Sequence, residues 1–86
     1  NHTDYSISID EYFSLFVYGY NNLDIIEWVT MTTDQYVSLN PYPGGSYMCD
    51  VTGKKVGGEL VIVKETDGDK LFAILKFSAL YLLHPQ

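Results

Sequence analysis

The sequence predicts a single all-β domain spanning residues 1–86, on the basis of three observations. The chain has 86 residues, the size of one domain. Only 19% of its residues are charged, below the usual share of about 25%, and Tyr, Thr, Ser and Asn fill the difference. Turn-forming segments recur at short intervals, which is typical of sandwiches and barrels. We therefore expect roughly six or seven strands, mainly antiparallel, in a small barrel or a two-layer sandwich.

Two strands are expected near the N-terminus. Residues 5–9 alternate apolar and polar side chains, the period-two pattern of a half-buried strand. Residues 12–18 are rich in aromatic and β-branched side chains, which favours a second strand. An α+β fold with one short helix near residues 9–19 is the alternative, because Ser8 and Glu11 have the spacing of a capping box. The poor helix propensity of Tyr, Phe and Val favours the strand.

Three strands are expected in the middle of the chain. Residues 24–32 alternate as a strand does, with Trp28 on one face and Val29 on the other. Residues 36–39 and 46–51 predict two shorter strands, the first of them ended by a proline.

A hairpin near the C-terminus is the most strongly indicated element. Residues 59–64 form an apolar strand, and residues 70–77 form its return strand. Asp67 and Gly68 between them favour a tight turn. The pattern does not specify the structure of residues 78–83. Three alternatives stay open: these residues extend the return strand, start another strand or form a short helix.

The charges are distributed unevenly, which bears on the partners. The net charge is −6, and the chain contains no arginine. Residues 1–53 carry seven acidic side chains and no lysine, whereas all five lysines follow them. This balance disfavours nucleic acids and anionic membranes as partners, because both attract cationic surfaces. It favours a protein partner that presents a basic patch.

No residue pattern indicates catalysis, so we expect neither an enzyme nor a cofactor. Cys49 would need a neighbouring base to act as a nucleophile, and His2 and His84 lie near the chain ends. Alternation with its neighbours favours a buried, structural Cys49. These residues form no metal-ligand spacing, and residues 67–69 match only a fragment of a calcium loop. The glycine-rich stretch 52–58 has its lysines in the wrong order for a phosphate loop.

The cysteine count and the apolar segments bear on the compartment. One cysteine excludes an intrachain disulfide, which favours a reducing environment. The polar N-terminal residues lack the basic and apolar segments of a secretory signal. The longest apolar stretch, residues 71–83, is interrupted and too short to span a bilayer as a helix. We expect a cytoplasmic protein, with a secreted mature chain as the alternative.

Protein binding is the function class that these observations favour. We expect a small acidic module, such as an inhibitor, immunity or accessory protein, that docks an acidic aromatic surface on a basic patch of a larger protein. Mimicry of nucleic-acid charge is the sharpest form of this hypothesis. The candidate interface residues are acids and aromatic anchors: Asp24, Glu27, Trp28, Asp34, Tyr36, Tyr42 and Tyr47. Two alternatives stay open, namely a structural subunit that forms homo-oligomers through its sheet and a β-barrel that binds a small ligand.

Overall fold

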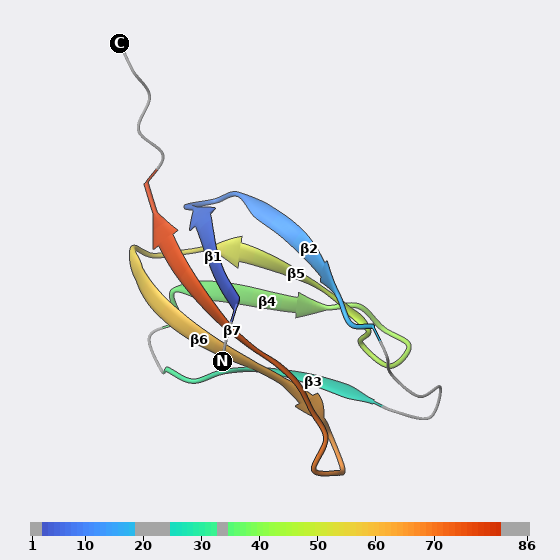
Figure 1. The fold of residues 1–86 in the computed structure, drawn as a ribbon. Helices are drawn as coiled ribbons and strands as arrows, with labels where there is room; N and C mark the ends of the chain where they lie inside the picture. Colours follow the sequence, from blue (N-terminus) through green and yellow to red (C-terminus); the bar gives the residue numbers. More distant parts are fainter. Residues whose placement is uncertain (1–2, 19–24, 33–34, 82–86) are drawn as a thin grey trace.

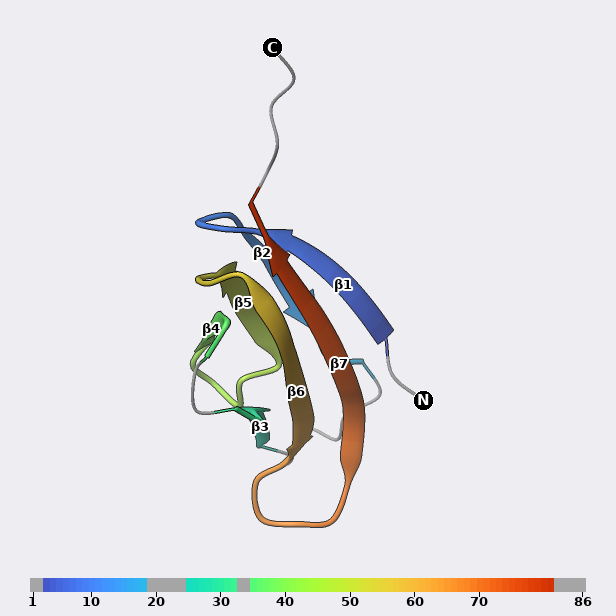
Figure 2. The same cartoon turned by 90° about the vertical axis from the view of Figure 1, so that its left-hand side faces the viewer.

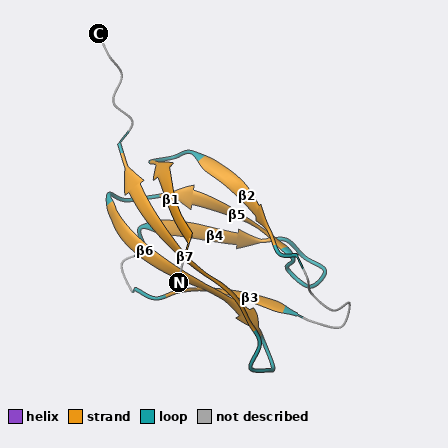
Figure 3. Ribbon diagram, in the orientation of Figure 1, coloured by secondary structure: helices purple, strands orange, loops and turns teal. Residues whose placement is uncertain are grey.

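The computed structural model describes residues 3–18, 25–32 and 35–81, and these residues form seven strands (Figure 1). The strands are β1 (Thr3–Ser8), β2 (Tyr12–Phe16), β3 (Ile26–Thr30), β4 (Val37–Pro41), β5 (Met48–Gly53), β6 (Gly57–Glu65) and β7 (Leu71–Leu80). The described residues contain strands and loops but no helix (Figure 3). The strand prediction for the segment around β2 is therefore confirmed, and the helix alternative is wrong. Within the described ranges there is accordingly no apolar helix of bilayer-spanning length.

The strands form two sheets that pack on each other as a sandwich (Figure 2). The four-stranded sheet has the order β1-β7-β6-β3, and the three-stranded sheet has the order β2-β5-β4. All paired strands run antiparallel except β1 and β7, which run parallel. The all-β prediction is confirmed in its sandwich form. The barrel form is wrong, because the two sheets remain separate instead of closing into one.

Alternate side chains of each strand point towards a core that the two sheets share. In β5, Cys49, Val51 and Gly53 are buried, whereas the residues between them are half-buried. The same alternation buries Val61 and Val63 in β6. The buried apolar side chains come from both sheets: Ile7, Val17, Ile26, Trp28, Val37, Cys49, Val51, Val61, Val63, Leu75, Phe77 and Ala79.

Three aromatic rings join the two sheets across this core. Tyr5 of β1 stacks on Phe77 of β7, with ring centroids 5.2 Å apart and an interplanar angle of 18°. Phe13 of β2, in the other sheet, packs edge-on against both rings at 5.6 and 5.9 Å. Edge-to-face aromatic pairs contribute about 0.5–1.5 kcal/mol each beyond burial, so this cluster fixes how the sheets pack.

The chain passes from one sheet to the other at a tight corner after β1. Asp10 adopts the left-handed conformation with φ of 68°, and its N–H donates to the Gly53 carbonyl at 2.8 Å. The Gly53 N–H donates to the Glu11 carbonyl at 3.0 Å. A Cβ on Gly53 would lie 2.5 Å from the Ser8 carbonyl oxygen. The corner therefore requires glycine at position 53 because the two backbones touch there.

The C-terminal hairpin of β6 and β7 forms as predicted. The two strands pair antiparallel, and the register shifts between Val63 and Lys64. Strand β7 continues to Leu80, so strand extension is the alternative that holds for residues 78–80. Residues 82–83 lie outside the described residues. The predicted strand at residues 46–51 is found two residues later in the chain, as β5.

Glu59 carries its carboxylate into the core, where it is 1% exposed. Its Oε1 accepts hydrogen bonds from Thr32 Oγ1 at 2.9 Å and from the Tyr36 N–H at 3.1 Å. Its Oε2 accepts a hydrogen bond from the Thr32 N–H at 3.2 Å. Burying a carboxylate is costly unless it is hydrogen-bonded, so these donors make its burial tolerable. The network holds both ends of the β3–β4 connection against β6.

Candidate functional site

The outer face of the three-stranded sheet carries the candidate site. Alternation turns Phe13 and Leu15 of β2 towards the core and leaves their neighbours on the outside. The strand pairing aligns the outward side chains in three rows: Tyr12, Thr52 and Ser38; Ser14, Asp50 and Asn40; and Phe16, Met48 and Tyr42. We call this surface the Asp50 face.

Asp50 lies in the middle row of the Asp50 face, on the central strand of the sheet. Ser14 Oγ donates a hydrogen bond to Asp50 Oδ1 at 2.5 Å. The Tyr42 hydroxyl lies 3.0 Å from both carboxylate oxygens and donates to them. An ionised carboxylate has about four acceptor positions, so these two donors orient it and leave acceptor capacity at Oδ2. Asp50 is therefore pre-oriented to accept a further donor, such as a lysine or arginine of a partner.

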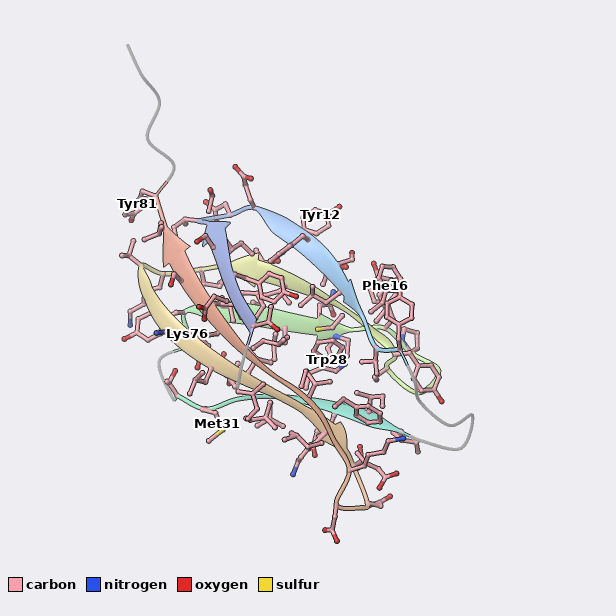
Figure 4. The ribbon with its side chains drawn as sticks, in the orientation of Figure 1. Tyr12, Phe16, Trp28, Met31, Lys76 and Tyr81 are labelled. Carbon is pink, nitrogen blue, oxygen red and sulfur yellow. The ribbon has the colours of Figure 1, made fainter. Side chains whose placement is uncertain are left out.

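Tyr42 contacts this carboxylate, and two aromatic side chains of β2 lie in the rows on either side of it. Tyr12 and Phe16 project from β2 and are 67% and 58% exposed (Figure 4). Tyr42 follows β4 and is 37% exposed. Next to it lies an open hollow, lined by residues 40–43 and Asp50. Exposed aromatic rings beside an oriented polar group are typical anchors of protein interfaces.

The Asp50 face is negative at its centre and mixed in charge at one end. Within the described strands β2, β4 and β5, Asp50 is the charged residue and no lysine occurs. Asp10 and Glu11 are exposed in the corner before β2. Lys54 and Lys55 follow β5 at the same end, and Lys55 Nζ lies 5.2 Å from the centroid of the Tyr36 ring. These acids and lysines offset one another, so Asp50 sets the charge of the middle of the face.

Two pKa shifts follow from these surroundings. The hydrogen bond to Asp50 raises the pKa of the Tyr42 hydroxyl above its ordinary value of 10.0, because a phenolate would face the carboxylate. On the other side of β5, burial raises the pKa of the Cys49 thiol to about 11. Cys49 is fully buried, as the alternation in its strand predicts. Its thiol is protonated at neutral pH and therefore held in its less reactive form.

Three of the predicted interface residues lie on the core side of the sandwich. Trp28 is only 9% exposed, and its indole N–H donates to the Ser46 carbonyl at 2.8 Å. Tyr36 and Tyr47 are half-buried and pack against the core. Alternation along β3 turns Trp28 inwards, between the sheets (Figure 4). In this buried position Trp28 stabilises the fold and is not accessible to a partner.

The other predicted residues that the structure describes, Tyr42 and Glu27, do not lie on one surface either. Tyr42 lies on the Asp50 face. Glu27 lies on β3 of the other sheet, where its carboxylate is 3.7 Å from Lys64 Nζ. Asp24 and Asp34 fall outside the described residues. Of the predicted residues that the structure describes, Tyr42 is therefore the one that belongs to the candidate site.

Sequence reasoning missed Asp50, Ser14, Tyr12 and Phe16 as a group. One available signal was the alternation in residues 46–51, since a buried Cys49 turns its neighbour Asp50 outwards. The pairing of Ser14 with Asp50 depends on the register between β2 and β5. These strands are far apart in the sequence, and no local pattern specifies their register.

A groove of about 210 Å³ opens between the two sheets. Aromatic and aliphatic side chains provide most of its lining: Thr3, Tyr5, Leu15, Phe16, Val17, Tyr18, Trp28, Val63, Phe72, Ala73 and Leu75. Its volume is below the ~300–1,000 Å³ typical of small-molecule pockets, so we assign it no ligand. In the described part of the chain, no three His, Cys, Asp or Glu side chains gather as a metal site would require.

The fold and the Asp50 face define a small β-sandwich that presents an oriented surface carboxylate among exposed aromatic rings. Comparison with known proteins adds no family to this description. No protein-family model, no curated protein and no solved structure matches the chain.

Proposed function

We propose that this chain is a small acidic protein-binding module, of the inhibitor, immunity or accessory kind, that docks its Asp50 face on a basic patch of a larger protein. One observation carries the proposal. The Asp50 carboxylate is oriented by Ser14 and Tyr42 in the middle of a surface whose described strands hold no cation. The net charge of −6 supports the same partner chemistry, because it attracts basic proteins over long range.

Charge and aromatic rings have separate roles in this docking. The negative charge speeds the encounter and selects basic partners. Burial of Tyr12 and Phe16 supplies most of the affinity, at roughly 1.5–3 kcal/mol for a fully buried large apolar side chain. A lysine or arginine that donates to Asp50 adds a charge-assisted hydrogen bond. Because Asp50 is already oriented, this bond forms with little further loss of side-chain entropy.

The proposed docking depends on aromatic anchors more than on mimicry of nucleic acid. Mimicry requires several carboxylates spaced like successive phosphates. The described strands of the Asp50 face carry one carboxylate, flanked by exposed rings. We therefore propose that the charge selects the partner and that Tyr12, Phe16 and Tyr42 hold it.

A capture experiment with two matched variants tests the proposal. Wild-type protein, Asp50→Asn and Glu27→Gln are immobilised, exposed to a native lysate of the source cells and eluted with a salt gradient. Each variant removes one carboxylate, but from opposite sheets. We expect one basic protein to bind wild type and Glu27→Gln, to elute at moderate salt, and to be lost on Asp50→Asn.

Two results would contradict the proposed function. One is equal retention of the same protein on Asp50→Asn and Glu27→Gln, which would place the contact elsewhere. The other is retention that salt does not weaken, which would remove the role of charge. Melting curves of the three proteins provide the control, because a variant that unfolds says nothing about docking.

A further inference from the structure

The outer face of the four-stranded sheet carries a contiguous apolar surface. Val29, Ile62 and Ile74 lie side by side across β3, β6 and β7. In the next row the Met31 N–H donates to the Leu60 carbonyl, which continues the surface beyond the end of β3. We call the outward apolar residues of these strands the apolar patch: Val29, Met31, Leu60, Ile62, Leu71 and Ile74.

The apolar patch is open to solvent. Met31 is 59% exposed, Leu71 is 55% exposed and Leu60 is 40% exposed. Val29 and Ile62 are half-buried, as is Ile74. Figure 4 shows Met31 on the opposite side of the sandwich from Tyr12 and Phe16. A contiguous apolar surface of this kind is often functional, even on a monomeric domain.

The charged side chains in the outward strand rows that bound the apolar patch cancel, although the chain as a whole is strongly acidic. At one end Glu27 lies 3.7 Å from Lys64. At the other end Asp4 of β1 lies directly opposite Lys76 of β7 in the strand register. Within the strands, each end row thus holds one acid and one lysine, so a second copy of this face can pair opposite charges at either end.

We propose that the apolar patch is a self-association surface, on which a second copy of the chain packs face to face. A basic partner is better matched by the Asp50 face, because the apolar patch has no net charge to attract it. A second copy buries apolar surface against apolar surface. The charged side chains in the strand rows beside the contact are balanced, so the local repulsion between the two chains is small, despite a net charge of −6 on each chain.

The size of the apolar patch sets the strength of this contact. The two-fold symmetry of the contact sets its stoichiometry. Three strands about 4.8 Å apart, over roughly six residues of about 3.3 Å each, cover on the order of 300 Å². Stable dimers bury about 800 Å² per partner, so we expect a weak dimer that forms between about 0.1 and 1 mM. A two-fold, face-to-face contact uses the same surface on both copies and stops at two.

Sedimentation velocity of the full chain over this concentration range tests the proposal with a matched pair of variants. Met31→Lys places a charge in the apolar patch, and Phe16→Lys places the same charge on the Asp50 face. The two side chains are almost equally exposed, at 59% and 58%. We expect the mass of wild type and Phe16→Lys to rise from 9.8 kDa towards twice that value as concentration increases. Met31→Lys stays monomeric, with dimerisation weakened at least about tenfold by the buried unpaired charge.

Three outcomes would overturn the self-association proposal. A wild-type chain that stays monomeric at about 1 mM would leave the apolar patch to a different partner. Loss of the dimer in Phe16→Lys but not in Met31→Lys would place the contact on the other sheet. Growth beyond two copies would indicate edge-to-edge strand pairing instead of a closed contact. Leu60→Lys is a second variant within the apolar patch and should behave as Met31→Lys does.

Discussion

The two outer faces of the sandwich use the same strand geometry and present different chemistry. The Asp50 face is polar at its centre, with an oriented carboxylate and aromatic rings around it. The face of β3, β6 and β7 is apolar at its centre, with charge pairs at its ends. We therefore propose a basic partner for the first face and a second copy of the chain for the other.

One inner strand of each sheet, β5 and β6, shows this difference. In β5 the outward positions are Met48, Asp50 and Thr52, whereas in β6 they include Leu60 and Ile62. Both strands bury their other side in the same core, where Val51 and Val61 are fully buried. Core positions thus specify the fold, and the alternate positions of these two inner strands set the chemistry of each surface.

The largest loss of stability is expected at the corner where the chain passes from one sheet to the other, because both faces depend on it. We expect Gly53→Ala to destabilise the fold by about 3 kcal/mol or more, because its Cβ would meet the backbone of Ser8. That Cβ would lie 2.5 Å from the Ser8 carbonyl oxygen, which leaves the corner no room to relax. Chemical denaturation measures the loss, and both faces should lose their binding together as the variant unfolds.

Gly58→Ala is the matched control for the corner. Its Cβ would have the Phe77 carbonyl oxygen at 3.9 Å as its nearest neighbour. We expect a change of no more than about 0.5–1 kcal/mol, in the stabilising direction, because alanine restricts the unfolded chain. Equal losses in the two variants would mean that the contact between the corner and Ser8 does not control the packing of the sheets.

The second-largest effect is expected at Glu59, inside the four-stranded sheet. Glu59→Gln keeps one acceptor for Thr32 Oγ1 and Tyr36 N–H but turns an amide towards the Thr32 N–H. We expect a loss of about 1–3 kcal/mol, as for a buried hydrogen-bonding group left without a partner. Glu27→Gln, which removes an exposed ion pair at 3.7 Å, should cost no more than about 1 kcal/mol. Urea denaturation compares the two, and a larger loss in Glu27→Gln would contradict this account.

The smallest effect is expected on the Asp50 face, where Asp50→Asn changes the pKa of Tyr42. We expect Asp50→Asn to lower the pKa of Tyr42 towards its ordinary value of 10.0, because the charged acceptor is lost. The raised pKa means that the Tyr42–Asp50 bond stabilises the fold below pH 10, and that this contribution is lost as pH rises through the folded value. An NMR titration of the tyrosine rings measures the pKa of the Tyr42 hydroxyl separately from those of the other tyrosines. Glu11→Gln, in the corner, should leave the Tyr42 titration unchanged, and an equal shift in both variants would indicate a general charge effect.

Local patterns predicted the strands well. Alternation and turn residues predicted the β6–β7 hairpin, and they placed Trp28 and Val29 on opposite faces of β3. They also predicted a buried Cys49. These features depend on neighbours in the sequence, which is why the sequence alone contains them.

Long-range pairing could not be predicted in the same way. The parallel pairing of β1 with β7 joins segments some seventy residues apart, and no local signal specifies it. The same holds for the register that sets Ser14 beside Asp50. Trp28 appeared a suitable interface anchor because Trp is common in interfaces, but its burial depends on which face of β3 meets the other sheet.

The most direct test of the central claim is partner capture on Phe16→Lys and Met31→Lys, run side by side. The two substitutions add the same charge at nearly equal exposure, on opposite faces of one sandwich. We predict that immobilised Phe16→Lys no longer captures the basic partner and that immobilised Met31→Lys captures it as fully as wild type does. Loss on Met31→Lys with retention on Phe16→Lys would contradict it and would assign the partner to the apolar patch.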